Sequence, residues 1–405
     1  MPGVTVSGGG GRHHVYLASN LWSGLWITQQ PICWEIQKTE KIVFVERFVS
    51  IFTVLRYPRF WRQLFAWAQG ARRISERLTV VSPLPLFHLG HRFPWLFQVE
   101  FWIQRLWIRW AVRRTKGDRI LWVDNPMLSC AAGAMGERLF IYHVADEFSE
   151  FSTSHPAVAR RLEKRMLARA DLVFAAAERL ADEKRKENPA TYAVLNAIDA
   201  RLFSDDSGVR DPVVAGIPSP RVVFIGVVDH WVDTALIRHV AKSLPEASVL
   251  VVGPGSEKNA DLQGVANLHA IGPIPRAQVP SILKSASVSL VPFKRNALTE
   301  RILPLKIFEA LAAGVMPVCT PFSPELGGLA KAGFLRIGNS YDEFTSVVRE
   351  VIAGDTPSSR ERLRMFGLDQ TWEARWYQMK ALINTALERP MREGTNSRRE
   401  TLKTA

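Results

Sequence analysis

Short apolar runs alternate with helix-length segments along most of the 405 residues. Each run is apolar or β-branched and ends in polar or turn residues, which is typical of strands in a parallel sheet wrapped by helices. In the first half this pattern predicts strands at 13–20, 41–46, 78–83, 119–126, 139–146 and 171–177. It also predicts a helix ending near Lys38.

The pattern lapses at 201–221, where "RLFSDDSGVRDPVVAGIPSPR" is rich in Gly, Pro, Ser and Asp, and this predicts a domain boundary. Beyond it the alternation restarts, with strands expected at 222–228, 248–255, 267–274, 288–293, 315–320 and 333–338. Helices are expected up to Leu244, from Arg276, at 306–313 and at 371–388. We therefore expect an α/β protein with two doubly wound domains.

The predicted organisation has six parts: a flexible lead (1–14), a first domain (15–205), a linker (206–220), a second domain (221–370), a final helix (371–388) and a disordered basic tail (389–405). In open α/β sheets, ligands bind outside the carboxyl ends of the strands. With two such sheets facing each other, we expect the site in the cleft between them.

Composition narrows the class of protein. The chain is 47% hydrophobic and 22% charged, with no apolar stretch of the length that spans a membrane and no secretory-signal pattern at its start. Its three cysteines have no metal-ligand spacing, which suits a reducing cytoplasm. The glycine-rich dinucleotide fingerprint is missing after the first strand, and this argues against a dehydrogenase.

Charge is distributed unevenly. Of a net charge of +13, much comes from 47–119, which holds 14 Lys or Arg, three acids and six of the 13 tryptophans. Within it, the helix-length segment 93–114 combines tryptophans and arginines, as expected of a helix lying on anionic lipid headgroups. The alternative is that the tryptophans form a buried aromatic core and the arginines a solvated basic face. Positive charge by itself is weak support for nucleic-acid binding, so no nucleic-acid partner is expected. The proposed membrane-surface residues are Trp102, Arg105, Arg109 and Trp110.

The segment "PLKIFEALAAGVMPV" (304–318) places a lysine and a glutamate in an otherwise apolar helix. Pro304 suits a first helical turn, whose free N–H groups, together with Lys306, attract an anion. Glu309 follows one turn later, with two acceptor oxygens that suit the two hydroxyls of a ribose. The spacing fits a nucleotide, diphosphate first and sugar next. The alternative is a Lys306–Glu309 surface pair.

This segment and several others resemble parts of the GT-B-fold glycosyltransferases of group 1. "RILPLKIFEALAAGVMPVCT" is similar to their nucleotide-sugar-binding helix and strand, and "VVFIGVVDHWVD" to the strand and glycine turn that open the donor domain. Further similar segments are 170–180, 196–203, 251–255, 268–293 and 371–379. The resemblance covers about 15–385 and implies two Rossmann-like domains facing a central cleft. The first would bind the acceptor and the second the nucleotide sugar, and the final helix would pack back across both.

More narrowly, "WSGLWITQQ" (22–30) and "YHVADEF" (142–148) resemble exopolysaccharide-type, glucuronosyltransferase-like enzymes such as those of teichuronic acid and xanthan assembly. Two positions depart from the family. Its glutamate eight residues before Glu309 is replaced by Arg301, and an acidic residue after the tyrosine is replaced by His143. These departures leave open a catalytically silent GT-B protein that serves as an assembly subunit or binding module.

For the donor, the resemblance implies that Glu309 binds the ribose, Lys306 the diphosphate, and Arg301 acts as a second cation. Positive groups there would stabilise the departing nucleoside diphosphate, so neither a metal nor another cofactor is expected. Gly226 either admits the substrate or makes a tight turn, and Asp229 either binds donor or starts a helix. Backbone groups from Gly272 to Arg276 would frame the base.

For the acceptor, Asp146 follows an apolar strand, where it is a candidate base for the acceptor hydroxyl or a helix N-cap. His143 is expected to be a strand residue near the cleft that makes a hydrogen bond and takes part in catalysis. Trp26 and Gln30 are expected to line the acceptor side.

We therefore predict a metal-independent glycosyltransferase of the hexosyltransferase type. It would move a sugar from a nucleoside-diphosphate-sugar, UDP-sugar favoured, to a hydroxyl of a lipid-linked or polysaccharide acceptor in exopolysaccharide biosynthesis. It would be cytoplasmic and associate peripherally with the inner face of the plasma membrane. A nucleotide-sugar epimerase on the same fold is the other enzymatic alternative.

Overall fold

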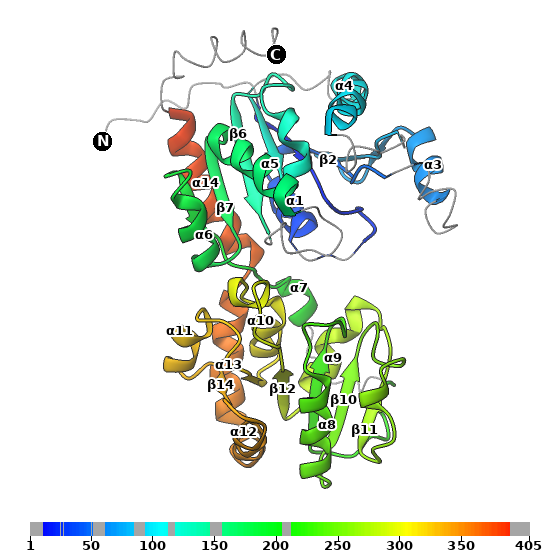
Figure 1. The fold of residues 1–405 in the computed structure, drawn as a ribbon, viewed down its shortest axis with the longest axis vertical. Helices are drawn as coiled ribbons and strands as arrows, with labels where there is room; N and C mark the ends of the chain where they lie inside the picture. Colours follow the sequence, from blue (N-terminus) through cyan, green and yellow to red (C-terminus); the bar gives the residue numbers. More distant parts are fainter. Residues whose placement is uncertain are drawn as a thin grey trace. The chain divides into compact units, whose positions relative to one another are not determined.

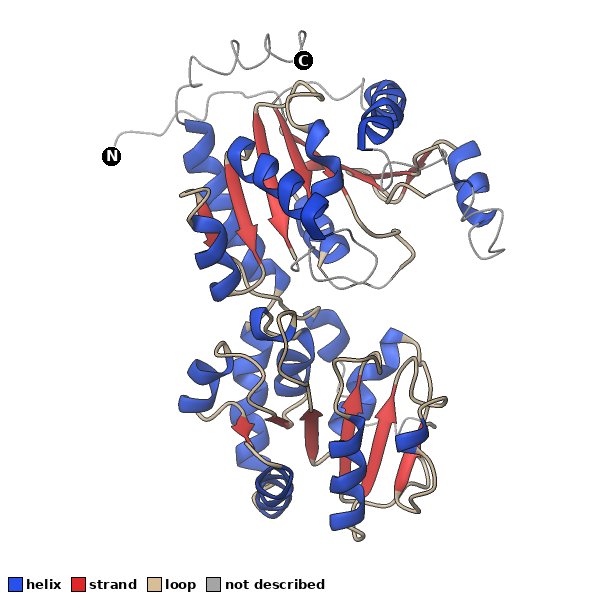
Figure 2. Cartoon of the chain, in the orientation of Figure 1, coloured by secondary structure: helices blue, strands red, loops and turns tan. Residues whose placement is uncertain are grey.

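The computed structural model describes residues 11–24, 26, 28–49, 51, 61–84, 94–111, 118–145, 156–204 and 212–388. The chain divides into two compact units. The first comprises the residues up to 194 together with those from 376, and the second comprises 195–375. Each unit holds one sheet flanked by helices (Figures 1 and 2).

The first unit is built on an eight-stranded sheet in the order β3-β4-β2-β1-β5-β6-β7-β8. Neighbouring strands are parallel except β3, which runs antiparallel to β4 at the edge. The strands are β1 (His13–Leu17), β2 (Lys41–Val45), β3 (Ala71–Arg73), β4 (Leu78–Val81), β5 (Arg119–Val123), β6 (Leu139–Val144), β7 (Leu172–Ala175) and β8 (Thr191–Ala193). Its helices are α1 (Gln29–Gln37), α3 (Trp61–Ala68), α4 (Pro94–Ala111), η2 (Pro126–Ala131), α5 (Pro156–Arg169) and α6 (Glu178–Arg185).

The second unit has a six-stranded sheet in the order β11-β10-β9-β12-β13-β14, with all neighbours parallel. Its strands are β9 (Arg221–Ile225), β10 (Ser248–Val252), β11 (Leu268–Ala270), β12 (Val288–Val291), β13 (Met316–Cys319) and β14 (Arg336–Ile337). Its helices are α7 (Ala200–Phe203), α8 (Thr234–Ser243), η4 (Ala260–Leu262), η5 (Arg276–Gln278), α9 (Val279–Lys284), η6 (Thr299–Arg301), α10 (Leu305–Ala312), α11 (Leu326–Lys331), α12 (Tyr341–Ala353) and α13 (Pro357–Asp369). Helix α14 (Trp372–Glu388) begins in this unit and continues into the first.

The expected fold class, two doubly wound α/β domains, is confirmed. Every predicted strand is present but shorter than expected, because the polar and turn residues at the ends of the apolar runs lie in loops. All five residues of β1 are buried, since helices cover both faces of the sheet. On one face, the rings of Tyr16, Phe44 and Trp122 stack on neighbouring strands.

The boundary between the units lies at Leu195, not at 205 as expected from composition. The side chains of Ile198 and Phe203 are fully buried in the core of the second unit, so this stretch folds with it. At the other end of the chain, Trp376 packs against His14 of the first unit, with ring centroids 5.7 Å apart. This contact places most of α14 in the first unit.

Each sheet has a point at which the strand order reverses. In the first sheet β1 lies between β2 and β5, and in the second β9 lies between β10 and β12. The chain therefore leaves β1 and β9 toward one side of the sheet and later returns to build the other side. Ligands of doubly wound sheets bind at such switch points, outside the carboxyl ends of the strands.

Candidate functional site

Lys306 reaches the switch point of the second sheet from the first turn of α10. Its Nζ lies 4.3 Å from the ring centroid of Phe224 on β9 and 4.6 Å from that of Phe293, which follows β12. Burial lowers the pKa of Lys306 to about 7, although nearby Glu309 raises it. The amine makes no hydrogen bond or ion pair with the described part of the chain. At and below about neutral pH it is a cation with no counter-ion among the described residues, at a place suited to a ligand.

The loops after β9, β10 and β11 meet backbone against backbone beside this amine. The N–H of Gly226 donates to the Val252 carbonyl at 2.9 Å, and the N–H of Gly253 donates to the Gly272 carbonyl at 2.7 Å. A Cβ on Gly226 would lie 2.6 Å from the Lys306 Nζ, and one on Gly253 would lie 2.1 Å from the Gly226 oxygen. The carboxyl edge of the sheet is therefore lined by bare backbone.

These two glycines predict different defects. In Gly226→Ala the new methyl group meets the flexible end of Lys306, but the backbone φ of +150° is strained for an L side chain. We therefore expect displacement of the amine, a roughly tenfold loss of affinity for a nucleoside diphosphate and a loss of only about 1 kcal/mol in stability. In Gly253→Ala the methyl group meets backbone at φ +138°, so we expect a loss of at least about 2 kcal/mol in stability. Urea denaturation and calorimetric titration with UDP measure the two effects, and equal instability of both variants would contradict this assignment.

Glu309 lies one helical turn from Lys306 and is only 6% exposed. Its carboxylate pairs with the guanidinium of Arg276, which comes from η5. The alternative of a Lys306–Glu309 surface pair is therefore wrong, because the carboxylate is buried and its partner is Arg276. Three residues expected at the donor site, Lys306, Glu309 and Arg276, thus lie on one side of the second sheet.

Helix α10 holds these groups firmly. Ile307, Phe308 and Leu311 are fully buried in the core of the second unit, as the alanine-rich pattern predicts. Its N-cap residue, Pro304, makes no side-chain capping hydrogen bond, which suits an anion at the N–H groups of the first turn.

The other expected donor residues lie in different surroundings. The guanidinium of Arg301 donates to the Ala297 carbonyl at 2.6 Å within its own loop. Asp229 is exposed and accepts from the His230 N–H, and this bond lowers the pKa of the carboxyl. The N-cap of α8 is Asp233, which accepts from a backbone N–H at 3.0 Å, so Asp229 does not start the helix.

Residues 219–355, which contain all of these groups, match the family model described as glycosyl transferases group 1. They form a group 1 glycosyltransferase domain. This match confirms the resemblance found in "VVFIGVVDHWVD" and "RILPLKIFEALAAGVMPVCT".

Relatives and solved structures that match longer stretches of the chain agree with this family match. A Bacillus subtilis protein named as a teichuronic acid biosynthesis glycosyltransferase (TuaH) is 28% identical over 166 residues, which cover 39% of this chain and 42% of that protein. The match thus spans less than half the length of this relative. The sucrose-phosphate synthase of Thermosynechococcus elongatus, with 12% identity, superposes with a TM-score of 0.70 over 93% of this chain and 98% of its own. Anabaena HepE in complex with UDP and glucose has 14% identity and a TM-score of 0.64, over 93% and 100% of the two chains. The chain has the GT-B fold.

In the first unit, His143 lies in the core and not at a surface. It is 1% exposed, and its Nδ1 makes a 2.7 Å hydrogen bond with the hydroxyl of Tyr16. Burial lowers the pKa of His143 to about 4, so the imidazole is neutral at pH 7. The expected strand position and hydrogen bond are confirmed. Tyr16 occupies the Nδ1 atom, and the expected catalytic role stays a prediction. Asp146 lies outside the described residues.

Trp26 and Gln30 hold the loop that follows β1. Gln30 is fully buried and donates from Nε2 to the Leu21 carbonyl at 2.8 Å. Trp26 is half-buried and donates from Nε1 to the Trp22 carbonyl at 3.2 Å. The nearby carboxylate of Asp124 was not predicted as a site residue. Its position directly after an apolar strand could have indicated it.

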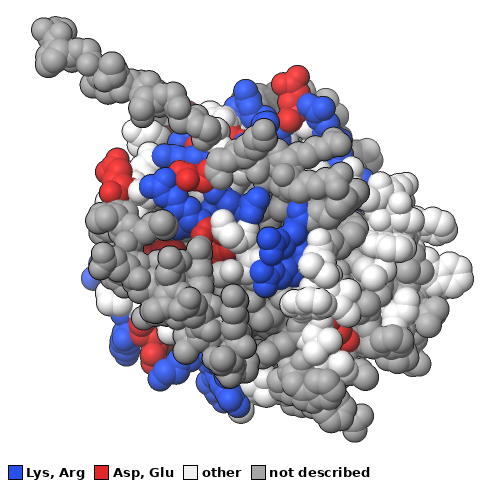
Figure 3. Space-filling model, turned by 90° about the horizontal axis from the view of Figure 1, so that it is seen from above, with Lys and Arg blue, Asp and Glu red and all other residues white. Residues whose placement is uncertain are grey.

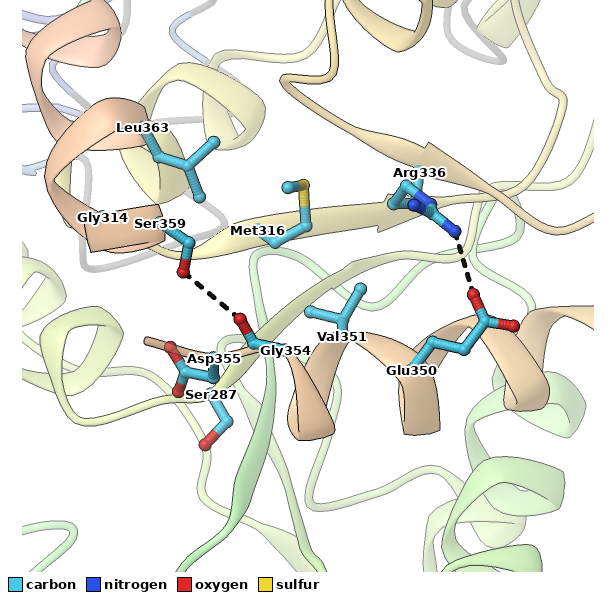
Figure 4. Close-up of a pocket in the computed structure, with 10 residues that line it drawn as sticks. All are labelled: Ser287, Gly314, Met316, Arg336, Glu350, Val351, Gly354, Asp355, Ser359 and Leu363. Carbon is cyan, nitrogen blue, oxygen red and sulfur yellow. Dashed lines mark hydrogen bonds and ion pairs between the residues drawn. The ribbon is translucent and has the colours of Figure 1, made fainter. Parts of the chain in front are cut away.

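A small cavity of about 160 Å³ lies at the opposite, amino edge of the second sheet (Figure 4). At its rim Arg336 pairs with Glu350 at 2.9 Å, and the Ser359 hydroxyl donates to the Gly354 carbonyl at 3.4 Å. These polar groups satisfy one another, so the cavity offers a ligand little. Within the described ranges, no three His, Cys, Asp or Glu side chains are grouped to hold a metal ion.

Proposed function

We propose that the protein is a glycosyltransferase that moves a sugar from a nucleoside-diphosphate-sugar to a hydroxyl of a lipid-linked or polysaccharide acceptor. The observation that carries the donor half is the Lys306 amine, held without a counter-ion in the Gly226 turn and one helical turn from Glu309. UDP-sugars are favoured because HepE, which shares the fold, was solved with UDP and glucose. A role in cell-surface polysaccharide synthesis is supported by the name of the Bacillus subtilis relative.

The residues of this chain would act mainly by stabilising charge. As the bond between the sugar carbon and the diphosphate breaks, negative charge grows on the leaving group, and the Lys306 ammonium and the first turn of α10 would neutralise it. Glu309 would hold the ribose hydroxyls once the ribose displaces Arg276. The acceptor oxygen forms the new bond to the sugar carbon, and its proton passes to a base, for which Asp146 is the candidate from sequence, or to the departing nucleoside diphosphate. We propose no role for a metal or other cofactor in this step.

The test is thermal unfolding with UDP, GDP, ADP, CDP and dTDP, followed by a transfer assay with UDP-sugars. A nucleotide at a hundredfold over its dissociation constant stabilises the folded state by about 2.7 kcal/mol. Stabilisation with transfer supports the proposal. Stabilisation without transfer favours the silent assembly subunit, conversion of the sugar while still on the nucleotide favours an epimerase, and no stabilisation by any nucleotide contradicts the donor site.

We also propose that the first unit rests peripherally on the inner, cytoplasmic face of an anionic membrane. Helix α4 exposes Trp102 and Leu106 at 58% and 54%, beside the exposed Arg109 and the half-buried Arg105. The side chain of Trp110 lies outside the described residues. Large apolar side chains grouped on a surface mark interaction sites, and arginines beside them suit lipid headgroups.

A second helix adds positive charge to this unit. Helix α5 exposes five cations, and α4 and α5 both contact η2. Lys and Arg predominate over Asp and Glu on the face drawn in Figure 3. The exposed cations of α5 are Arg160, Arg161, Lys164, Arg165 and Arg169. None of the helices in the described segments has both the length and the apolar character needed to span a bilayer.

A double variant, Trp102→Ser with Leu106→Ser, is expected to weaken binding to vesicles of phosphatidylglycerol and phosphatidylcholine at least tenfold. Each side chain loses about 1.5 kcal/mol or more of apolar burial in the membrane. The matched control is Met365→Ser with Tyr377→Ser, which removes two large side chains that are even more exposed, from α13 and α14. Co-sedimentation at low salt is the measurement, and a wild-type protein that stays in the supernatant would refute membrane association.

A further inference from the structure

Asp124 holds the place in the first sheet that the Lys306 site holds in the second. It is the first residue after β5, and Ser19 lies just beyond the end of β1. Strands β1 and β5 are parallel neighbours, and the strand order reverses between them. The two residues therefore lie at the switch point of this sheet, outside its carboxyl edge, where a doubly wound sheet binds its ligand.

Among the residues that the structure describes, other residues donate hydrogen bonds to one oxygen of the Asp124 carboxylate and not to the other. Oδ2 accepts from the Ser19 N–H at 3.1 Å, from the Ser19 hydroxyl at 3.0 Å and from the Gln29 Nε2 at 2.9 Å. Oδ1 has no hydrogen-bond partner among the residues that the structure describes, although the side chain is 1% exposed. A buried carboxylate oxygen without a donor is costly, so a group that supplies a donor is expected to bind there.

The described side chains that bond to Asp124 or lie beside it at the strand ends are polar and uncharged. The Asn20 amide donates to the Gln29 Oε1 at 3.4 Å, and the Asn125 side chain caps η2. Ser19, Asn20 and Asn125 are each half-buried and border the enclosed carboxylate. Hydroxyl and amide groups around one carboxylate suit a ligand that both donates and accepts hydrogen bonds, as a sugar does. None of these side chains is a cation, so the set does not suit a phosphate.

We propose that Asp124 binds a hydroxyl of the acceptor sugar through Oδ1, while Ser19 and Gln29 orient the carboxylate. This inference rests on the proposed transferase function, for which it names the acceptor-binding residue. Burial raises the pKa of Asp124 to about 6, so the carboxylate is ionised above that pH and accepts the hydroxyl proton in a hydrogen bond. The competing explanation is structural, namely that Asp124 only ties the loop after β1 to β5.

The variant Asp124→Asn separates these two explanations. The asparagine oxygen can keep all three hydrogen bonds from Ser19 and Gln29, and its NH₂ group replaces the unpartnered acceptor by a donor. We expect an unchanged melting temperature and unchanged UDP affinity, but a roughly thirtyfold or larger rise in KM for an octyl hexoside acceptor.

Glu46→Gln is the matched control. Glu46 is also buried and directly follows a strand of the same sheet, β2, but both of its oxygens have partners: the Trp22 N–H at 2.9 Å, and the Ser82 hydroxyl and Arg72. We expect it to lose stability and keep the acceptor KM. A melting temperature that falls in Asp124→Asn with an unchanged KM would overturn the proposal in favour of the structural explanation.

Sugar binding is also measured without chemistry, by saturation-transfer NMR on the intact protein with a panel of octyl hexosides. Saturation of a hexoside by wild type and Glu46→Gln but not by Asp124→Asn supports the site, even if no transfer is detected and the proposed function fails. If the wild-type protein binds UDP but transfers saturation to none of the hexosides, the acceptor site is refuted and the donor site is supported.

Discussion

Glu309→Gln is expected to abolish the stabilisation of the protein by UDP and to weaken its affinity about a hundredfold. The carboxylate is buried and is expected to accept from both ribose hydroxyls. Hydrogen bonds to a charged group contribute about 1.5–3 kcal/mol each, and the neutral amide keeps only one acceptor oxygen. Calorimetric titration with UDP gives the change in affinity, and thermal unfolding shows whether the variant is folded.

Arg276→Ala is the control, because it breaks the same ion pair from the other side. A loss of stability common to both variants measures the contribution of the ion pair to folding. Loss of UDP binding that is much larger in Glu309→Gln reports the contact with ribose. Glu309→Gln that binds UDP as tightly as wild type would show that Glu309 is a structural residue.

Lys306→Met is expected to raise the melting temperature while abolishing UDP binding. The lysine amine lies against Phe224 and Phe293, where methionine can pack without the cost of a buried charge. Loss of the cation removes the expected partner of the diphosphate. A gain in stability with a loss of binding is the signature of a residue retained for function.

The same residue predicts two pH dependences. Because the folded-state pKa of Lys306, about 7, lies below its ordinary value of 10.5, the unfolded chain binds more protons between these pH values. The stability of the wild type contributed by this group therefore rises with pH across that window. The advantage of Lys306→Met is then largest near pH 6 to 7 and shrinks toward about pH 10.

The affinity for UDP is expected to change with pH in the direction opposite to the stability. If the diphosphate needs the ammonium form, UDP affinity falls above about pH 7, by up to about tenfold per pH unit. Lys331→Met, at an exposed position on α11, is the control and should keep the wild-type profile. A Lys306→Met variant that melts lower than wild type, or that binds UDP normally, would remove Lys306 from the site.

The fold followed from sequence because parallel strands buried on both faces leave a strong local pattern. The same property left the direction of individual side chains undetermined. In such strands both faces are apolar, so alternation cannot tell which way a side chain points, and His143 was expected at the cleft although it faces Tyr16 inside the sheet packing. Strand β3 reads Ala-Arg-Arg and β8 reads Thr-Tyr-Ala, so neither is an apolar run of the kind that predicted the other strands.

Helices α12 and α13 could have been predicted but were missed. Ser340 caps the first, accepting from the Glu343 N–H, and Thr356 with Ser359 forms a capping box at the start of the second. Both are recognisable helix-start signals. Helix α12 packs on β12, β13 and β14, whereas α13 packs on α10. Neither helix holds an expected site residue.

The donor site was accessible from sequence only where local geometry fixes it. Lys306 and Glu309 lie three residues apart on one helix, so their spacing follows from the helix itself. Gly226 follows a strand directly, which places it at the carboxyl edge of the sheet. By contrast, the Arg276–Glu309 pair joins residues 33 apart, and nothing local specifies it.

The sequence by itself determined the class of fold, the places of most strands along the chain and the spacing of charged groups within α10, because each depends on a few consecutive residues. The tertiary structure decided which strand ends meet. It brought Phe224 and Phe293 around the Lys306 amine, and it joined Ser19 to Asp124 across 105 residues of chain. Strand order follows from the packing of whole helices and strands against one another, and short-range patterns carry no record of it.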